Sequence, residues 1–242
     1  MRVAVISDVH GNEQALEAVL AAIDEQAPDA VWCLGDTVGY GAAPNRCCEL
    51  VHERADVALV GNHDLVVVGS LSIDEFNYDA RDAALWTRDV LDVRWREWLT
   101  SVPSQTRTND TALFHASARD PVWEYVLSAD AAWWSFEATQ EPLLLVGHSH
   151  IPLAIGLDGD TVSGGHAPAD TERDLSAGRW LLNPGSVGQP RDGDARAAWL
   201  LLDLEERFAA FRRVHYPVER AQAEIHAAGL PGALADRLSD GI

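Results

Sequence analysis

Lysine is absent from this sequence of 242 residues, and all 18 basic residues are arginine. Against them stand 38 aspartates and glutamates, so the formal net charge at pH 7 is −20. A charge of this sign and size repels extended polyanions such as nucleic acids and anionic membrane surfaces. We therefore expect neither nucleic acid nor membrane among the partners, although an acidic surface can also serve solubility alone.

Long apolar runs and cysteine pairs are also lacking. No stretch reaches the about 18 apolar residues of a transmembrane helix, and Met1-Arg2 leads directly into an apolar run, so we expect no signal peptide. The three cysteines form no CxxC motif. Cys33 falls in a predicted strand, and Cys47 and Cys48 are adjacent on a predicted helix. These absences predict a cytoplasmic protein with reduced thiols and no cysteine metal site.

What the sequence does contain is a repeated pairing of an apolar run with polar, ligand-capable residues. Residues 57–60 (Val-Ala-Leu-Val) predict a buried strand that stops at Gly61, and Asn62, His63 and Asp64 follow at once. Four further runs, at 3–6, 31–34, 112–114 and 143–146, end in the same way. The ligand-capable residues that follow the five runs are Asp8, His10, Asp36, Asn62, His63, His115, His148 and His150. Because active sites of α/β sheets lie just past the carboxyl ends of strands, we expect these residues at one sheet edge.

The order of predicted elements indicates a single α/β domain over residues 1–242. Asn12 suits a helix N-cap, and the helix that follows ends before Pro28, which gives a βαβ opening and a parallel sheet. Beyond His150, short strands predict a meander in a second sheet, interrupted by an exposed loop over 163–178. Residues 218–240 predict two short helices.

Six tryptophans crowd the mainly helical region between residues 65 and 136: Trp86, Trp95, Trp98, Trp123, Trp133 and Trp134. Large rings contribute most burial in cores and interfaces, so we expect core or subunit-interface roles and leave a homo-oligomer open. Stacking on a substrate is the alternative interpretation.

Histidines and carboxylates without cysteine suit a hydrolytic centre of Mn, Fe or Zn character. Alternate residues of an extended segment share a face, so we expect Asp8 to lie beside His10 and His148 beside His150. Four other histidines stand outside any such pattern, and we expect structural roles for them: His52, His166, His215 and His226.

In these residues the chain resembles the calcineurin-like metallophosphoesterases. The motifs stand in the family's order: Asp8-Val9-His10-Gly11-Asn12, Gly35-Asp36, Gly61-Asn62-His63-Asp64, His115, Gly147-His148-Ser149-His150 and Asn183-Pro184-Gly185-Ser186. The segments Gly39-Tyr40-Gly41 and Gln189 to Asp194 are similar to the small prokaryotic branch of predicted phosphodiesterases and phosphatases.

The resemblance implies a four-layer α/β/β/α sandwich with two divalent metal ions, of which Asp36 would bridge both. The first ion would take Asp8, His10 and His150, and the second would take Asn62, His115 and His148. A bridging hydroxide would attack phosphorus in line, without a covalent enzyme intermediate. The implied activity is metal-dependent phosphoester hydrolysis.

The resemblance also implies roles for residues beside the ligands. His63 would protonate the leaving alkoxide as a general acid, although it could instead only hold Asn62 in place. Asn12 would either support the site by hydrogen bonding or serve as the helix cap alone. Arg191 and Ser186 are weaker candidates, since an arginine suits phosphate oxygens but also forms surface ion pairs.

We expect small phosphodiesters or nucleotides as substrates, because the negative shell disfavours long polyanions while two local cations attract a small phosphoester. A phosphomonoesterase acting on phosphoproteins or dinucleoside polyphosphates is the alternative within enzymes. A non-catalytic scaffold with a decayed site is the alternative outside them, and the full ligand set argues against it.

Overall fold

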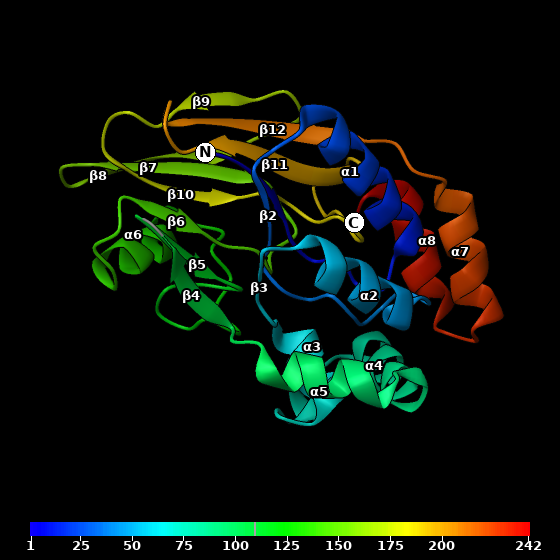
Figure 1. Ribbon diagram of the computed structural model, residues 1–242. Helices are drawn as coiled ribbons and strands as arrows, with labels where there is room; N and C mark the ends of the chain where they lie inside the picture. The colour runs from blue at the N-terminus through cyan, green and yellow to red at the C-terminus, as the bar shows by residue number, and fades with distance from the viewer. Residues whose placement is uncertain (109) are drawn as a thin grey trace.

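The apolar runs pair into two six-stranded sheets in the computed structural model, which describes residues 1–108 and 110–242 (Figure 1). The first sheet has the order β3 (Val57–Ala58), β2 (Ala30–Cys33), β1 (Arg2–Ile6), β11 (Ala197–Asp203), β12 (Phe208–Val214) and β9 (Glu172–Asp174). β1 lies parallel to β2, with Val3 opposite Ala30, and antiparallel to β11, with Arg2 opposite Asp203. The prediction that the strands beyond His150 form a second sheet is therefore wrong for β9, β11 and β12, which join the βαβ opening in the first sheet.

The second sheet joins the middle of the chain to the strands that follow it. Its order is β4 (Gln105–Thr108), β5 (Thr111–Phe114), β6 (Leu143–Leu145), β10 (Arg179–Asn183), β7 (Leu153–Asp158) and β8 (Thr161–His166). β6 is parallel to both β5 and β10, whereas β7 pairs antiparallel with β10 and β8.

Alternation along β1 shows how the sheets stack. Val3 and Val5 are buried in the core cluster between the sheets, which also holds Leu145 and Leu182 of the second sheet. Ala4 belongs to the core cluster on the other face, together with side chains of helix α1 (Glu13–Gln26). Both faces of β1 are thus covered by apolar groups, which explains its continuous apolar sequence.

Helices cover the outer face of each sheet, and the predicted four-layer α/β/β/α architecture is confirmed (Figure 1). On the first sheet lie α1, α2 (Pro44–Arg54), α7 (Val218–Ala227) and α8 (Gly232–Asp240). The second sheet is covered by α6 (Ala129–Glu137), which contacts β7, β8 and β10. No helix of the described residues is long and apolar enough to cross a membrane.

A separate helical group lies at one end of the sheets and holds three of the six tryptophans, Trp86, Trp95 and Trp98 (Figure 1). It comprises α3 (Asn62–Val68), the short 3₁₀ helix Ile73–Glu75, α4 (Tyr78–Val90) and α5 (Val93–Ser101). Trp95 is buried in its core, as predicted, whereas Trp134 on α6 is 51% exposed.

Three sequence predictions about strands were wrong. The strand expected over 57–60 is only Val57–Ala58, because the N–H of Val60 turns to the carbonyl of Pro103. The expected loop over 163–178 contains the end of β8 and all of β9, and strand β4 was not predicted. Strands β4, β8 and β9 are polar and largely exposed, so backbone hydrogen bonds form them and no apolar alternation marks them in the sequence.

Candidate metal centre

The predicted strand ends converge, but from two sheets and not from the one sheet edge that we expected, since β1, β2 and β3 belong to the first sheet and β5 and β6 to the second. The residues that follow them also lack the extended conformation that the spacing suggested. The backbone is left-handed at Asp8, His10, Asp36, His148 and His150, with φ between +49° and +62°. Residues other than glycine rarely adopt this conformation, and such strain concentrates at functional sites. Asp8 and His10 therefore meet across a tight turn, and the expected shared face of an extended segment was wrong.

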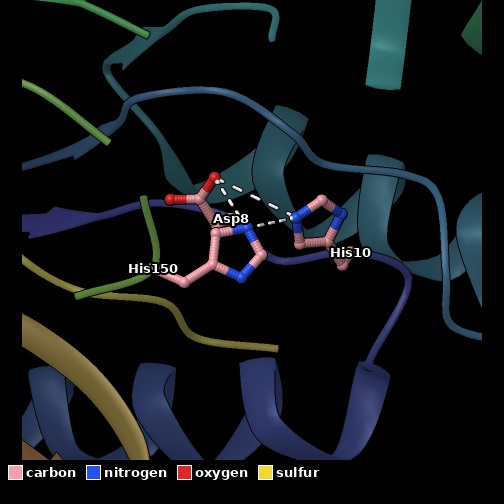
Figure 2. A group of neighbouring side chains, drawn as sticks. All are labelled: Asp8, His10 and His150. Atoms are coloured by element: carbon pink, nitrogen blue, oxygen red, sulfur yellow. Dashed lines mark hydrogen bonds and ion pairs between the residues drawn. The ribbon is translucent and has the colours of Figure 1, made fainter. Parts of the chain in front are cut away.

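One cluster is formed by Asp8, His10 and His150, whose polar atoms point toward one another (Figure 2). The Oδ1 atom of Asp8 lies 3.5 Å from Nε2 of His150 and 4.0 Å from Nε2 of His10. The two Nε2 atoms are 3.0 Å apart. All three side chains are buried.

A second cluster is centred on Asp36, which follows β2. Its Oδ2 lies 3.7 Å from Nε2 of His10 and 3.4 Å from Nε2 of His115. Nε2 of His115 is in turn 3.2 Å from Oδ1 of Asn62, and His148 completes a group with Asp36 and His115. Asp36 thus lies between the two sets of ligand-type atoms.

Backbone carbonyls fix the orientation of four histidine rings. Nδ1 of His10, His115 and His150 lies at the carbonyls of Val38, Leu34 and Gln189, and Nε2 of His148 lies at that of Trp123. A carbonyl oxygen only accepts, so the ring nitrogen beside it carries the hydrogen. The opposite nitrogen of each neutral ring keeps a free lone pair, which is the arrangement typical of metal-binding histidines.

This donor set fits divalent cations. With their Nδ1 hydrogens held, neutral His10 and His150 direct two lone pairs at each other over 3.0 Å, a repulsive contact that a cation between them would turn into an attractive one. Oδ2 of Asp36 is buried and accepts no hydrogen bond from any described residue. Buried anionic oxygens ordinarily have partners, so this atom also points to a bound cation.

Burial and charge set the protonation of the site. Burial lowers the pKa of His10 and His150 well below the usual range and that of His148 to about 3, which favours the neutral, metal-binding form. Burial also opposes a charge on His115, but the Asp36 carboxylate outweighs it and raises the pKa of His115 to about 9. Binding of a cation there would therefore release a proton from His115.

His63 lies at the start of α3 and faces the same site. Its ring is buried, packs 4.4 Å from the ring of Phe76 and 4.8 Å from that of His10, and its backbone N–H donates to Oδ1 of Asp36 at 2.9 Å. Burial lowers the pKa of His63 to about 4. A neutral imidazole here gains a proton most readily when an anion lies beside it.

Asp64 has a positioning role that sequence reasoning missed. Its buried carboxylate accepts the backbone N–H groups of Gly61, Thr37 and Val38 at 3.0, 3.2 and 2.9 Å. It thereby ties the loop that carries Asp36 to the start of α3. Its position as an acid in the first turn of a helix was the only local signal.

Three further candidates surround the ligand-type residues. Asn12 caps α1, since its Oδ1 accepts the N–H of Ala15, and its Nδ2 donates to the carbonyl of Gly188. Ser186 Oγ donates to the carbonyl of Asp8. Arg191 lies beside the site, where one of its nitrogens donates to Oε1 of Gln189 at 2.9 Å and contacts the Tyr40 hydroxyl at 3.4 Å.

A cavity of about 500 Å³ opens at the site between the helical group and the second sheet's loops. Its lining includes Asn62, His63 and His148, together with Phe76 and Trp123. The volume falls in the range of about 300–1,000 Å³ usual for small-molecule sites. A small ester can therefore reach the clustered side chains.

Comparisons with known proteins found a family match and similar structures. A family model described as the calcineurin-like phosphoesterase superfamily domain matches residues 1–207. The uncharacterised protein MJ0912 of Methanocaldococcus jannaschii is 38% identical, over 98% of this chain and 96% of its own. The crystal structure of a metallophosphoesterase from Sphaerobacter thermophilus is similar with a TM-score of 0.91 and 42% identity, covering 100% of this chain and 99% of that one. Hypothetical protein PH1004 from Pyrococcus horikoshii shares the fold, with a TM-score of 0.82, 21% identity and coverage of 100% and 98%.

Proposed function

Because this chain belongs to the calcineurin-like phosphoesterase superfamily, we propose that it hydrolyses small phosphodiesters or nucleotides with the help of two divalent metal ions. The superfamily supports a hydrolase, and the His and Asp clusters could hold metal. We propose that the ions are two in number, that they share Asp36 and that the substrate is a small phosphodiester or a nucleotide.

The observation that carries the proposal is the position of Asp36 between two sets of ligand-type atoms. Its Oδ2 faces Nε2 of both His10 and His115 and accepts no hydrogen bond within the described part of the chain. A carboxylate in that position can serve two cations at once, as a shared ligand does in two-metal hydrolases.

Seven residues would hold the ions. Asp8, His10 and His150 would serve one ion, Asn62, His115 and His148 the other, and Asp36 both. Nitrogen and oxygen ligands without sulfur suit Mn, Fe or Zn. Ions bound there would supply Lewis acidity toward phosphoryl oxygens and would lower the pKa of water.

His63 is the residue we propose as general acid. It lines the cavity next to Asn62, and an anionic phosphoester beside it would raise its lowered pKa and favour the protonated ring. It would then donate that proton to the departing alkoxide oxygen. Water supplies the oxygen that is retained on phosphorus, and the leaving group departs as an alcohol.

Arg191 is the residue we propose for holding a phosphate oxygen. Its guanidinium has five N–H donors, and Gln189 and Tyr40 engage only one of its nitrogens. A guanidinium engaged through one nitrogen can offer its other N–H groups to a phosphate.

We further propose a cytoplasmic protein in which residues 1–242 form one domain. The three cysteines are free and buried, which suits a reducing compartment. The shared core between the sheets supports the single domain. A homo-oligomer is left to measurement in solution.

Metal analysis of the wild type and of Asp36→Asn tests the proposal. We expect two ions per wild-type chain after equilibration with Mn²⁺ or Zn²⁺, and fewer in Asp36→Asn, because an amide offers one neutral oxygen in place of a shared carboxylate. Asp160→Asn, at an exposed turn, is the matched control and should bind two.

Elemental analysis and anomalous diffraction give the count and the ligands. One ion at saturating metal, with Asp36 directed elsewhere, would contradict the dinuclear centre. A screen of phosphodiesters and phosphomonoesters on the loaded protein then identifies the ester class, and absence of turnover on all of them would contradict the enzyme assignment.

A further inference from the structure

The cavity beside the candidate metal centre has an aromatic wall. Phe76, Trp123 and Tyr125 line it, from segments that precede α4 and α6. The rings of Phe76 and Trp123 meet edge to face at 6.1 Å, and the ring of Tyr125 stacks on His148 at 4.1 Å with an angle of 15° between the planes. Tyr125 is 47% exposed, so much of its ring is free to contact a ligand.

The cavity lies on one side of the centre only. Asn62, His63 and His148 line it, whereas His10 and His150 do not. The guanidinium of Arg191, the proposed phosphate contact, lies 3.4 Å from the hydroxyl of Tyr40, which lines the same cavity. A phosphoester held by Arg191 with its leaving group beside His63 would therefore place that group in the aromatic cavity.

Charge restricts what the cavity can take. Glu75 is its one charged lining residue apart from the histidines, among the described residues, and no arginine lines it. A second phosphate placed beside Glu75 would be repelled by its carboxylate. The exposed carboxylate of Glu75 and the side-chain amide of Asn77 can instead form hydrogen bonds with the polar edge of a ligand.

We propose that this cavity binds the base of a nucleoside whose sugar oxygen is the leaving group, an inference that rests on the proposed function. A flat heteroaromatic ring matches the wall of Phe76, Trp123 and Tyr125, and an exocyclic amino group matches Glu75. The volume accommodates a base with its sugar. Among nucleotides, the Glu75 carboxylate favours esters whose leaving group carries no further phosphate over dinucleoside polyphosphates.

Saturation-transfer NMR with adenosine and with ribose tests the site without requiring turnover. On the Zn²⁺-loaded protein we expect transfer to the adenine protons H2 and H8, and little to free ribose. Trp123→Leu should raise the dissociation constant for adenosine at least about fivefold, the low end of what base–aromatic stacking contributes. Tyr125→Leu, a change at a half-exposed ring, should act in the same direction and guards against misfolding of the first variant.

Trp134→Leu is the matched control, because Trp134 is 51% exposed on α6 and does not line the cavity. It should bind adenosine as the wild type does. Absence of transfer to adenine, or equal affinity in the wild type, Trp123→Leu and Tyr125→Leu, would overturn the nucleobase site even if phosphoesters are hydrolysed. Adenosine binding that depends on Trp123 in a protein that hydrolyses no ester would support the site and contradict the proposed function.

Discussion

Individual residues at the centre combine a ligand-type atom with hydrogen bonds to the backbone, which limits the substitutions they tolerate. Asp36 accepts the backbone N–H of His63 through Oδ1, while its Oδ2 faces Nε2 of His115 at 3.4 Å and Nε2 of His10 at 3.7 Å. His148 donates a backbone N–H to Asp8 at 3.0 Å and a ring N–H to the carbonyl of Trp123. Replacing such a residue alters both a ligand-type atom and the loop that carries it.

His63→Ala should keep its metal and lose activity on alkyl esters by about 10²–10⁴-fold, the usual contribution of general acid catalysis. The loss should be much smaller for nitrophenyl esters, whose leaving group needs little protonation. Steady-state rates on the two ester classes, with metal content measured beside them, give the comparison. Equal losses on both would assign His63 to holding Asn62 instead.

Gly61→Ala should lower metal affinity by about 10–100-fold, the range typical when groups behind the ligands are disturbed. A Cβ at Gly61 would overlap Oδ1 of Asp36 and the ring of His115. Metal titration followed by calorimetry measures the loss. Gly232→Ala is the control, since its Cβ would meet His226 no closer than 3.7 Å; unchanged metal affinity in Gly61→Ala would show that the site relaxes around a methyl group.

Among the elements, β12 ties the loop after Arg191 to the first sheet through a buried ion pair. The side chains of Arg213 on β12 and Asp192 are 2% and 5% exposed and contact each other directly. Arg213 also donates to the carbonyls of Asp194 and Arg196. The neighbouring Arg212 pairs instead with Asp170 and Glu172 at the surface.

Arg213→Ala should lower the free energy of unfolding by up to about 3–5 kcal/mol, because the buried Asp192 carboxylate loses its arginine partner and keeps only the ring of His166 at 3.0 Å. Arg212→Ala should change it by at most about 1 kcal/mol, since exposed ion pairs contribute little. Urea denaturation of both variants and the wild type measures the difference. Similar small changes in the two would show that water reaches Asp192.

At the scale of the whole molecule, the charge of −20 repels anionic substrates over long distances, whereas the candidate metal centre attracts a phosphate only nearby. The repulsion of a polyanion is screened beyond about 10 Å at 0.1 M salt. A small ester needs only a short approach to the centre, whereas a nucleic acid duplex must lie along the acidic surface.

Hydrolysis of a small diester should therefore exceed cleavage of duplex DNA, and added salt should raise any activity on DNA because it screens a repulsion. Parallel assays at low and moderate salt with the loaded protein measure both effects. DNA cleaved at low salt as efficiently as the small diester would replace this assignment with a nuclease.

The sequence by itself determined the strands with apolar faces, the caps and the kinds of residue at the centre, because burial periodicity and side-chain chemistry are local properties. It did not determine β4, β8 beyond Val162 or β9, whose polar residues are held by backbone hydrogen bonds to neighbours distant in the chain. Only the tertiary structure decided the left-handed turns at Asp8 and His10, since surrounding contacts maintain a conformation that the residues alone disfavour. The carbonyl partners of the histidines and the meeting of Phe76 with Trp123 also depend on how the layers pack, which no spacing along the chain encodes.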